Sequence, residues 1–218
     1  MKKTFQIAID GYSGVGKSTV AQIISKKLNF LFVNTGAMYR CYALAFINQN
    51  VDLNNKNEVI KCLENNKVVL GQENFFLNGE DVTKKISNPE VAAMASKIGT
   101  LKEVREKCVK DQQAIAADCN VIMEGRDTTS VVLPNATLKI FLSADVDTRA
   151  KRRWEQSNKE QSLETIKEFI TKRDYQDSHR EISPLIQVPD AFVIDTSNLS
   201  IDEVVENILK EFKNRTNV

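Results

Sequence analysis

The sequence predicts an α/β fold in which a parallel sheet is wrapped by helices, and three observations carry that prediction. Short apolar runs alternate with amphipathic stretches, a glycine-rich turn joins the first run to a helix, and the chain closes on an apolar run followed by a capped helix. Such alternation is typical of parallel sheets, whose strands are buried on both faces. We expect the strands at residues 5–9, 30–33, 121–123, 138–142 and 191–194.

The helices of this core are predicted by apolar period and by capping residues. Two helices are expected at 17–28 and 36–48, directly after the first two strands. The last helix is marked by Ser200 and Glu203, which have the S-x-x-E spacing of a capping box. Apolar residues with helical spacing follow the box, namely Val204, Val205, Ile208 and Leu209. The chain therefore closes on a strand followed by a helix.

The middle of the chain breaks this alternation. Short strand-like runs at 68–70 and 75–77 precede the dipeptide Asn78-Gly79, which favours a tight hairpin turn. A small antiparallel insert is therefore expected. Because it lies between two strands of the core, we interpret it as a substrate lobe, with structural decoration as the alternative.

Two further helices should follow the insert. Pro89 lies in the first turn of one of them, where a missing backbone N–H does no harm. Thr100 and Glu103 have the spacing of a second capping box, which predicts a helix that begins there and runs to about residue 118.

The composition excludes several classes of partner. Thirty basic and twenty-nine acidic residues give a net charge of +1, so no global charge favours nucleic acid or an anionic membrane. The four cysteines show neither a C-x-x-C pair nor zinc spacing, which fits reduced thiols in the cytosol. No stretch approaches the roughly 20 apolar residues of a membrane helix. We expect a cytoplasmic protein with small-molecule partners.

Residues 11–18 read G-Y-S-G-V-G-K-S, the spacing G-x-x-x-x-G-K-[ST] of a phosphate-binding loop. The motif follows a predicted strand and opens a helix, so its backbone N–H groups can converge on an anion. Lys17 can reach the β and γ phosphates, and the Ser18 hydroxyl can ligate Mg²⁺. The sequence therefore predicts a P-loop NTPase fold, with a purely structural glycine turn as the alternative. We expect ATP to contact Gly11, Tyr12, Ser13, Gly14, Val15, Gly16, Lys17, Ser18 and Thr19.

Arginines form local sets elsewhere in the chain. Arg149, Arg152 and Arg153 stand at i, i+3 and i+4 after the fourth strand, so they share a helix face and can converge on a phosphate. A solvated basic face is the alternative for this set.

A second set lies on a helix that we expect to end near Ser183. It contains Arg173, Asp177 and Arg180, at i, i+4 and i+7, for which an exposed ion pair is the alternative. Arg126 and Asp127 directly follow the third strand, at the carboxyl edge where ligands of parallel sheets bind.

A series of short segments, in this order, resembles bacterial cytidylate kinases. The segments are 36–40 (G-A-M-Y-R), 124–127 (E-G-R-D), 138–142 (L-K-I-F-L), 173–174 (R-D) with Arg180, 183–185 (S-P-L) and 194–196 (I-D-T). The resemblance covers nearly the whole chain. It implies one kinase domain over 1–218, with a core (1–36, 119–146 and 185–218), a small α+β monophosphate-binding lobe with its insert (37–118) and a helical lid (147–184). It also implies a monomer.

The resemblance implies roles for individual residues. The cytosine edge would be contacted by Ser96, Arg105 and Asp127. The acceptor phosphate would be held by Arg40, Arg126 and Arg180. The sugar would be contacted by Arg173 and Asp177, and the substrate site would also contain Thr35 and Tyr39. The transferred phosphoryl group would be stabilised by Lys17, Arg126, Arg149, Arg152, Arg153 and Arg180. Three positions depart from the family pattern. Relatives often have Asp in place of Glu124, Gly in place of Thr129 and Arg in place of Gln176. The change at Gln176 could weaken binding of the acceptor phosphate.

The expected reaction moves the γ-phosphoryl group of ATP to CMP or dCMP. A phosphate monoester has a second pKa of about 6 and is already largely dianionic at neutral pH, so no general base is needed and His179 is not expected to act. Ser18 should ligate Mg²⁺ directly. Asp10 or Glu124 should reach the ion through water, with a salt bridge near the loop as the alternative for Asp10.

Other activities are kept as rivals. The acceptor could be UMP or AMP, or a small hydroxylated metabolite. A P-loop switch or GTPase is disfavoured because no Asn-Lys-x-Asp guanine reader is present. An ATPase acting on nucleic acid is disfavoured because the charge is balanced.

Overall fold

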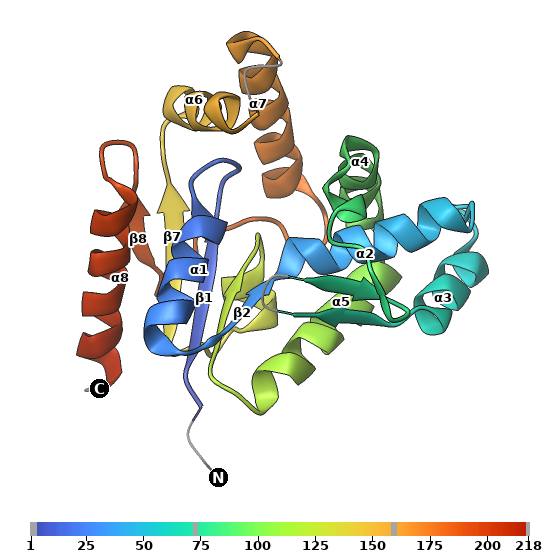
Figure 1. Ribbon diagram of the computed structural model, residues 1–218, viewed down its shortest axis with the longest axis horizontal. Coiled ribbons are helices and arrows are strands. Elements are labelled where there is room, and N and C mark those ends of the chain that lie inside the picture. The colour runs from blue at the N-terminus through green and yellow to red at the C-terminus, as the bar shows by residue number, and fades with distance from the viewer. Residues whose placement is uncertain (1–3, 72–73, 158–160, 217–218) are drawn as a thin grey trace. The chain divides into compact units, whose positions relative to one another are not determined.

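The computed structural model describes residues 4–71, 74–157 and 161–216 (Figure 1). It divides into two compact units. Unit 1 comprises Met1–Phe32 and Cys119–Val218, and unit 2 comprises Val33–Asp118. Each unit has its own core of buried apolar side chains.

Unit 1 contains the larger sheet. Its strands are β1 (Gln6–Gly11), β2 (Leu31–Asn34), which crosses the unit boundary, β6 (Val121–Glu124), β7 (Leu138–Ser143) and β8 (Phe192–Asp195), in the spatial order β2-β6-β1-β7-β8. β1 pairs in parallel with β6 and β7, and β7 with β8, so Ile7 lies between Ile122 and Leu138. The α/β prediction is confirmed, with each strand within two residues of its expected bounds.

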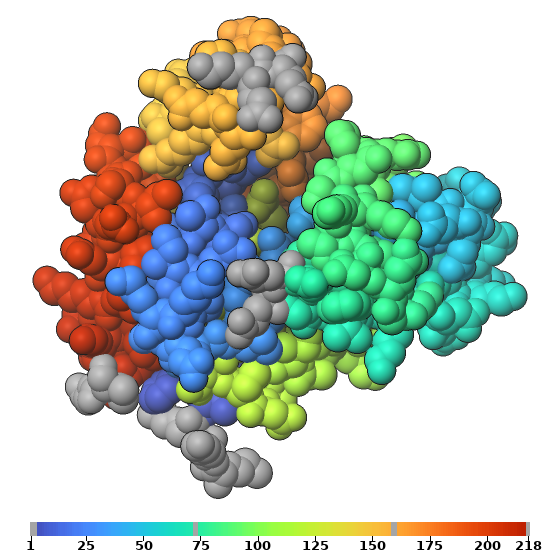
Figure 2. All heavy atoms as spheres, in the orientation of Figure 1, coloured from blue at the N-terminus to red at the C-terminus, as the bar shows by residue number. Residues whose placement is uncertain are grey.

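Helices complete unit 1. They are α1 (Lys17–Leu28), the short helical turn η2 (Thr128–Val132), α6 (Val146–Gln156), α7 (Leu163–His179) and α8 (Ile201–Thr216). α1 and α8 pack together over the sheet and are neighbours on the face seen in Figure 2. The predicted capping box of α8 is present, since Ser200 Oγ accepts from Glu203 N at 3.3 Å and Ser200 N donates to Glu203 Oε2 at 2.8 Å.

Unit 2 holds a second sheet and four helices among its described residues. Its elements are α2 (Thr35–Asn48), α3 (Lys56–Asn65), β3 (Val68–Leu70), β4 (Phe75–Leu77), β5 (Glu80–Asp81), the 3-10 turn η1 (Lys85–Ser87), α4 (Pro89–Ile98) and α5 (Lys102–Ala117). The predicted antiparallel insert is confirmed, in the order β3-β4-β5. Asn78 and Gly79 turn it with φ values of 54° and 86°.

Two sequence predictions about helix ends are wrong. α5 begins at Lys102, and its cap position is Leu101, because the Thr100 hydroxyl instead donates to Lys97 O at the end of α4 (2.7 Å). Glu103 pairs with Lys56 at 2.9 Å, so no capping box forms. α7 ends at His179 and not near Ser183, because Arg180 is extended (ψ 143°) and Ser183 takes a left-handed φ of 51°.

One helix was not expected from the sequence. The side chain of Asn55 caps α3 by accepting from the N–H groups of Asn57 and Glu58, and its own amide donates to Glu58 Oε1 at 2.8 Å. This Asn-x-x-Glu pattern is a capping signal that could have revealed the helix. None of the described helices combines the length and the apolar character needed to cross a bilayer.

Candidate active site

The phosphate-binding loop connects β1 to α1, as its motif predicts. Gly11 has to be glycine, because a Cβ there would lie 2.1 Å from Leu142 O. Gly14 and Gly16 have φ values of 82° and 92°, which residues with an L side chain rarely adopt. The loop therefore keeps a shape in which backbone N–H groups precede the N-terminus of a helix, where an anion is favoured.

Lys17 folds back over this loop. Its side chain is buried, and its Nζ donates to Gly11 O at 2.8 Å and to Tyr12 O at 2.7 Å. Burial and then the positive charge of Arg126 lower the pKa of Lys17 to about 7, although Glu124 acts in the opposite direction. The positive charge of the ammonium group therefore lies at the loop with too little negative charge nearby to balance it. A bound polyphosphate would supply that negative charge.

The two acidic residues expected near a metal have different surroundings. Glu124, at the end of β6, accepts from Ser18 Oγ at 2.8 Å. Both side-chain oxygens are hard ligands of the kind that Mg²⁺ prefers. Asp10 is fully buried and accepts from Thr128 N (2.9 Å), Thr129 N (2.7 Å) and Thr129 Oγ1 (2.6 Å). Within the described residues Asp10 forms no ion pair, so the salt-bridge alternative for it is wrong.

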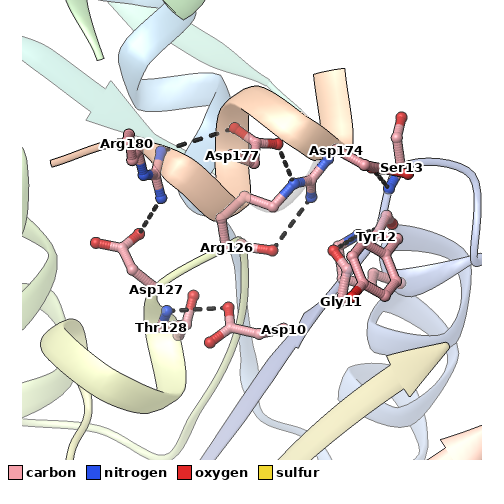
Figure 3. A network of polar contacts seen from close by, with 12 residues as sticks. Asp10, Gly11, Tyr12, Ser13, Arg126, Asp127, Thr128, Asp174, Asp177 and Arg180 are labelled. Atoms are coloured by element: carbon pink, nitrogen blue, oxygen red, sulfur yellow. Dashed lines mark hydrogen bonds and ion pairs between the residues drawn. The ribbon is translucent and has the colours of Figure 1, made fainter. Parts of the chain in front are cut away.

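An arginine–carboxylate network lies beside the loop (Figure 3). Arg126 Nε donates to Asp177 Oδ2 at 2.8 Å, and Arg180 lies 3.8 Å from both Asp177 and Asp127. Burial disfavours the charged guanidinium of Arg126, but Asp177, with the carboxylates of Glu124 and Asp174, outweighs burial and raises the pKa of Arg126. The Asp177 side chain is only 15% exposed, so an exposed surface ion pair, the alternative interpretation, is ruled out.

The three arginines of α6 share a helix but not a target. Arg149 donates to Ser13 O (3.1 Å) and Ala144 O (3.0 Å) and pairs with Asp174. Arg152 donates to the hydroxyl (3.0 Å) and the carbonyl (2.6 Å) of Thr196.

Arg153 differs from both, because its guanidinium lies 5.1 Å from the ring centre of Phe169. Burial and the charge of Arg126 lower its pKa. In this structure the three arginines of α6 therefore do not converge on one point, and they are not a solvated basic face either.

The remaining expected substrate residues lie partly in unit 2. There Arg105 is buried, donates to Gly99 O at 3.0 Å and lies 5.7 Å from the ring centre of Tyr39. Thr35 is buried at the start of α2, Arg40 is half-buried and Ser96 is exposed on α4. In unit 1, Arg173 adds positive charge near Lys17 and contributes to lowering its pKa.

Sequence reasoning missed one residue of this region. Asp174 is buried on α7, and its Oδ1 accepts from the backbone N–H of Ser13 in the phosphate loop at 3.0 Å. The sequence held a weak signal for it, since Asp174 belongs to the Arg-Asp segment at 173–174.

His179 is exposed, and its ring stacks on that of Tyr175 with 4.0 Å between the ring centres.

Comparisons with known proteins show the family of this chain. The family model described as cytidylate kinase matches residues 7–214. The cytidylate kinase of Caldicellulosiruptor saccharolyticus is 43% identical over 217 residues, and that of Bacillus cytotoxicus 42% over 216, each match covering 96% of both chains. A crystal structure of an uncharacterized protein from Eubacterium ventriosum matches this chain with a TM-score of 0.55 and 14% sequence identity. The match covers 97% of this chain and 99% of that chain, and it supports the fold alone. The chain belongs to the cytidylate kinase family.

Proposed function

We propose that this protein transfers the γ-phosphoryl group of ATP to CMP and dCMP, giving ADP with CDP or dCDP. One observation carries the proposal beyond family membership. The phosphate loop with its buried Lys17 and the network around Arg126, Asp177 and Arg180 lie together in unit 1. Two anion-binding groups of residues in one unit suit a reaction between two phosphates.

The chemistry is an in-line displacement at the γ-phosphorus. An oxygen of the CMP phosphate forms the new P–O bond, the bond from the γ-phosphorus to the β,γ-bridging oxygen breaks, and ADP leaves with that electron pair. The attacking phosphate is already dianionic, so no base has to remove a proton. The chain's task is to neutralise the repulsion between two anions, which Lys17, Arg126 and Arg180 would do.

Mg²⁺ fits the oxygen donors at the end of the loop. Ser18 would be its direct protein ligand, and Glu124, which already accepts from Ser18, would contact it through water. We prefer Glu124 to Asp10 for this role because both Asp10 oxygens accept hydrogen bonds from Thr128 and Thr129. The ion would supply positive charge at the β and γ phosphate oxygens.

Selectivity for cytosine would rest on complementary hydrogen bonds. The amino group of cytosine is a donor that a carboxylate such as Asp127 can accept, and Arg105 and Ser96 would donate to its ring nitrogen and carbonyl. Uracil would present a carbonyl to the same carboxylate and leave both acceptors unsatisfied. We assign unit 2 as the monophosphate-binding lobe and residues 147–184 as a lid that excludes water.

The test is an ADP-release panel with purified protein, Mg²⁺ and ATP. CMP and dCMP should support turnover, and UMP, AMP and shikimate should support much less. Lys17→Ala should abolish nearly all turnover while its circular dichroism spectrum stays that of the wild type. Release that is fastest with AMP or shikimate, or the same without any acceptor, would overturn the proposed acceptor.

A further inference from the structure

The third residue of the phosphate loop is held from outside by two lid helices. Ser13 is buried, its N–H donates to Asp174 Oδ1 on α7 at 3.0 Å, and its carbonyl accepts from Arg149 Nη1 on α6 at 3.1 Å. Asp174 and Arg149 also pair with each other, and both are buried. The two side chains and the Ser13 peptide groups therefore close a ring of charge-assisted hydrogen bonds around one loop residue.

Arg149 is suited to this position by its shape. Its planar guanidinium donates in three directions, to Ser13 O, to Ala144 O at 3.0 Å and to Asp174. It also lies 5.3 Å from the ring centre of Tyr12, the second loop residue. A Cβ on Gly14 would be 3.1 Å from Arg149 O, so the backbone of α6 packs directly against the loop.

We infer that Asp174 and Arg149 are positioning residues that hold the phosphate loop in its anion-binding shape, and that Arg149 acts on the loop instead of on the transferred phosphoryl group. The inference rests on the proposed function and changes the role that the family resemblance implies for Arg149. Because the loop binds phosphate through its backbone N–H groups, a loop that is already ordered loses less freedom when ATP binds. Asp174 should therefore act on ATP affinity.

The two possible roles of Arg149 predict opposite results for Asp174→Asn. If the arginine holds the loop, the variant weakens the charge-assisted contacts and ATP binds more weakly. If the arginine instead contacts phosphate, loss of its buried carboxylate partner frees it, and ATP binds equally well or better.

The experiment compares Asp174→Asn with Glu168→Gln, which removes one negative charge from an exposed position of the same helix. Hydrogen exchange of the loop peptide, measured by mass spectrometry without nucleotide, should be faster in Asp174→Asn only. Its KM for ATP should rise by about tenfold or more, while its KM for CMP stays within about threefold. Saturating MgATP should restore protection of the loop.

The inference is overturned if Asp174→Asn matches Glu168→Gln in loop exchange and in KM for ATP, or if ATP binds more tightly. If Asp174→Asn does not fold, Arg149→Lys takes its place, since it keeps the charge but lacks the planar fork, and it should show the same loop-specific exchange. The exchange measurement needs no turnover. It therefore separates failure of this inference from failure of the wild type to phosphorylate CMP, which would refute the proposed function.

Discussion

Lys17 is a buried lysine whose charged form the fold disfavours. Its Nζ contacts two loop carbonyls, but burial and Arg126 lower its pKa to about 7, well below the ordinary lysine value of 10.5. A bound triphosphate would place several negative charges beside it and raise that pKa again. Nucleotide binding and protonation of Lys17 are therefore linked.

This linkage predicts proton uptake when ATP binds. At pH 8 Lys17 is mostly neutral in the nucleotide-free protein, so the complex should take up close to one proton. At pH 6 the lysine already carries its proton, and uptake from it should vanish. Isothermal titration in buffers of different ionisation enthalpy measures the number directly. Lys17→Met is the control that should take up fewer protons at pH 8, and equal uptake by both proteins would contradict the linkage.

Asp127 is the residue on which the predicted choice of base depends. Asp127→Asn replaces an obligate acceptor with an amide that can also donate, so it can pair with the carbonyl of uracil. The ratio of kcat/KM for CMP to that for UMP should fall by about tenfold or more, while the KM for ATP changes little. Asp118→Asn, an exposed position in unit 2, should leave the ratio unchanged. An unaltered ratio in Asp127→Asn would argue against its role as base reader.

At the scale of elements, the turn η2 is anchored by a strand that precedes it by more than a hundred residues. The Asp10 carboxylate, at the end of β1, accepts from the first two N–H groups of η2 and from the Thr129 hydroxyl. It thus takes the place of a local capping side chain, and η2 directly follows Asp127. The bond from the Thr129 hydroxyl depends on a residue that departs from the family pattern, where glycine is common.

Thr129→Val should measure this anchor, because valine keeps the shape of the side chain and removes only the hydroxyl. The free energy of unfolding in urea should fall by about 1 to 3 kcal/mol, since a buried hydrogen bond to a carboxylate is lost. Ser130→Ala, whose hydroxyl has only a 3.5 Å contact with Asp127 O, should cost less. The anchor would be unimportant for stability if the two variants unfolded at the same urea concentration.

At the scale of the whole molecule, the residues assigned to CMP are divided between the two units. Arg105 and Ser96 belong to unit 2, whereas Asp127 and Arg180 belong to unit 1. The residues assigned to ATP all lie in the loop and the first turn of α1, in unit 1. The two substrates should therefore protect different parts of the chain.

Peptide-level hydrogen exchange tests this division. CMP should slow exchange in α4 and α5 of unit 2, where Ser96 and Arg105 lie, and also at the start of η2 in unit 1, directly after Asp127. ATP alone should slow exchange in the phosphate loop. UMP at the same concentration serves as the control and should protect less than CMP. Protection by CMP that is confined to one unit would contradict the assignment.

Local patterns in the sequence predict most of the helices and strands and, within the site, the phosphate loop. The core strands pair over long distances in the chain, but their apolar runs mark them in the sequence. The hairpin at Asn78-Gly79 and the capping box at Ser200 depend on contacts between residues near one another in the chain. The phosphate loop belongs to the same class, because its function lies in backbone geometry that three glycines permit.

How the charged side chains pair depends on the fold and not on local sequence. Ser18 meets Glu124 across 106 residues and Ser13 meets Asp174 across 161. Helical spacing showed only that Arg149, Arg152 and Arg153 share a face and can converge on a phosphate. The capping box predicted at Thr100 fails in part for the same reason, since Glu103 pairs with Lys56 of α3. Spacing shows which residues share a helix face. Which opposite charge or carbonyl each side chain contacts depends on the fold, because a buried charge is stable only where it has a partner.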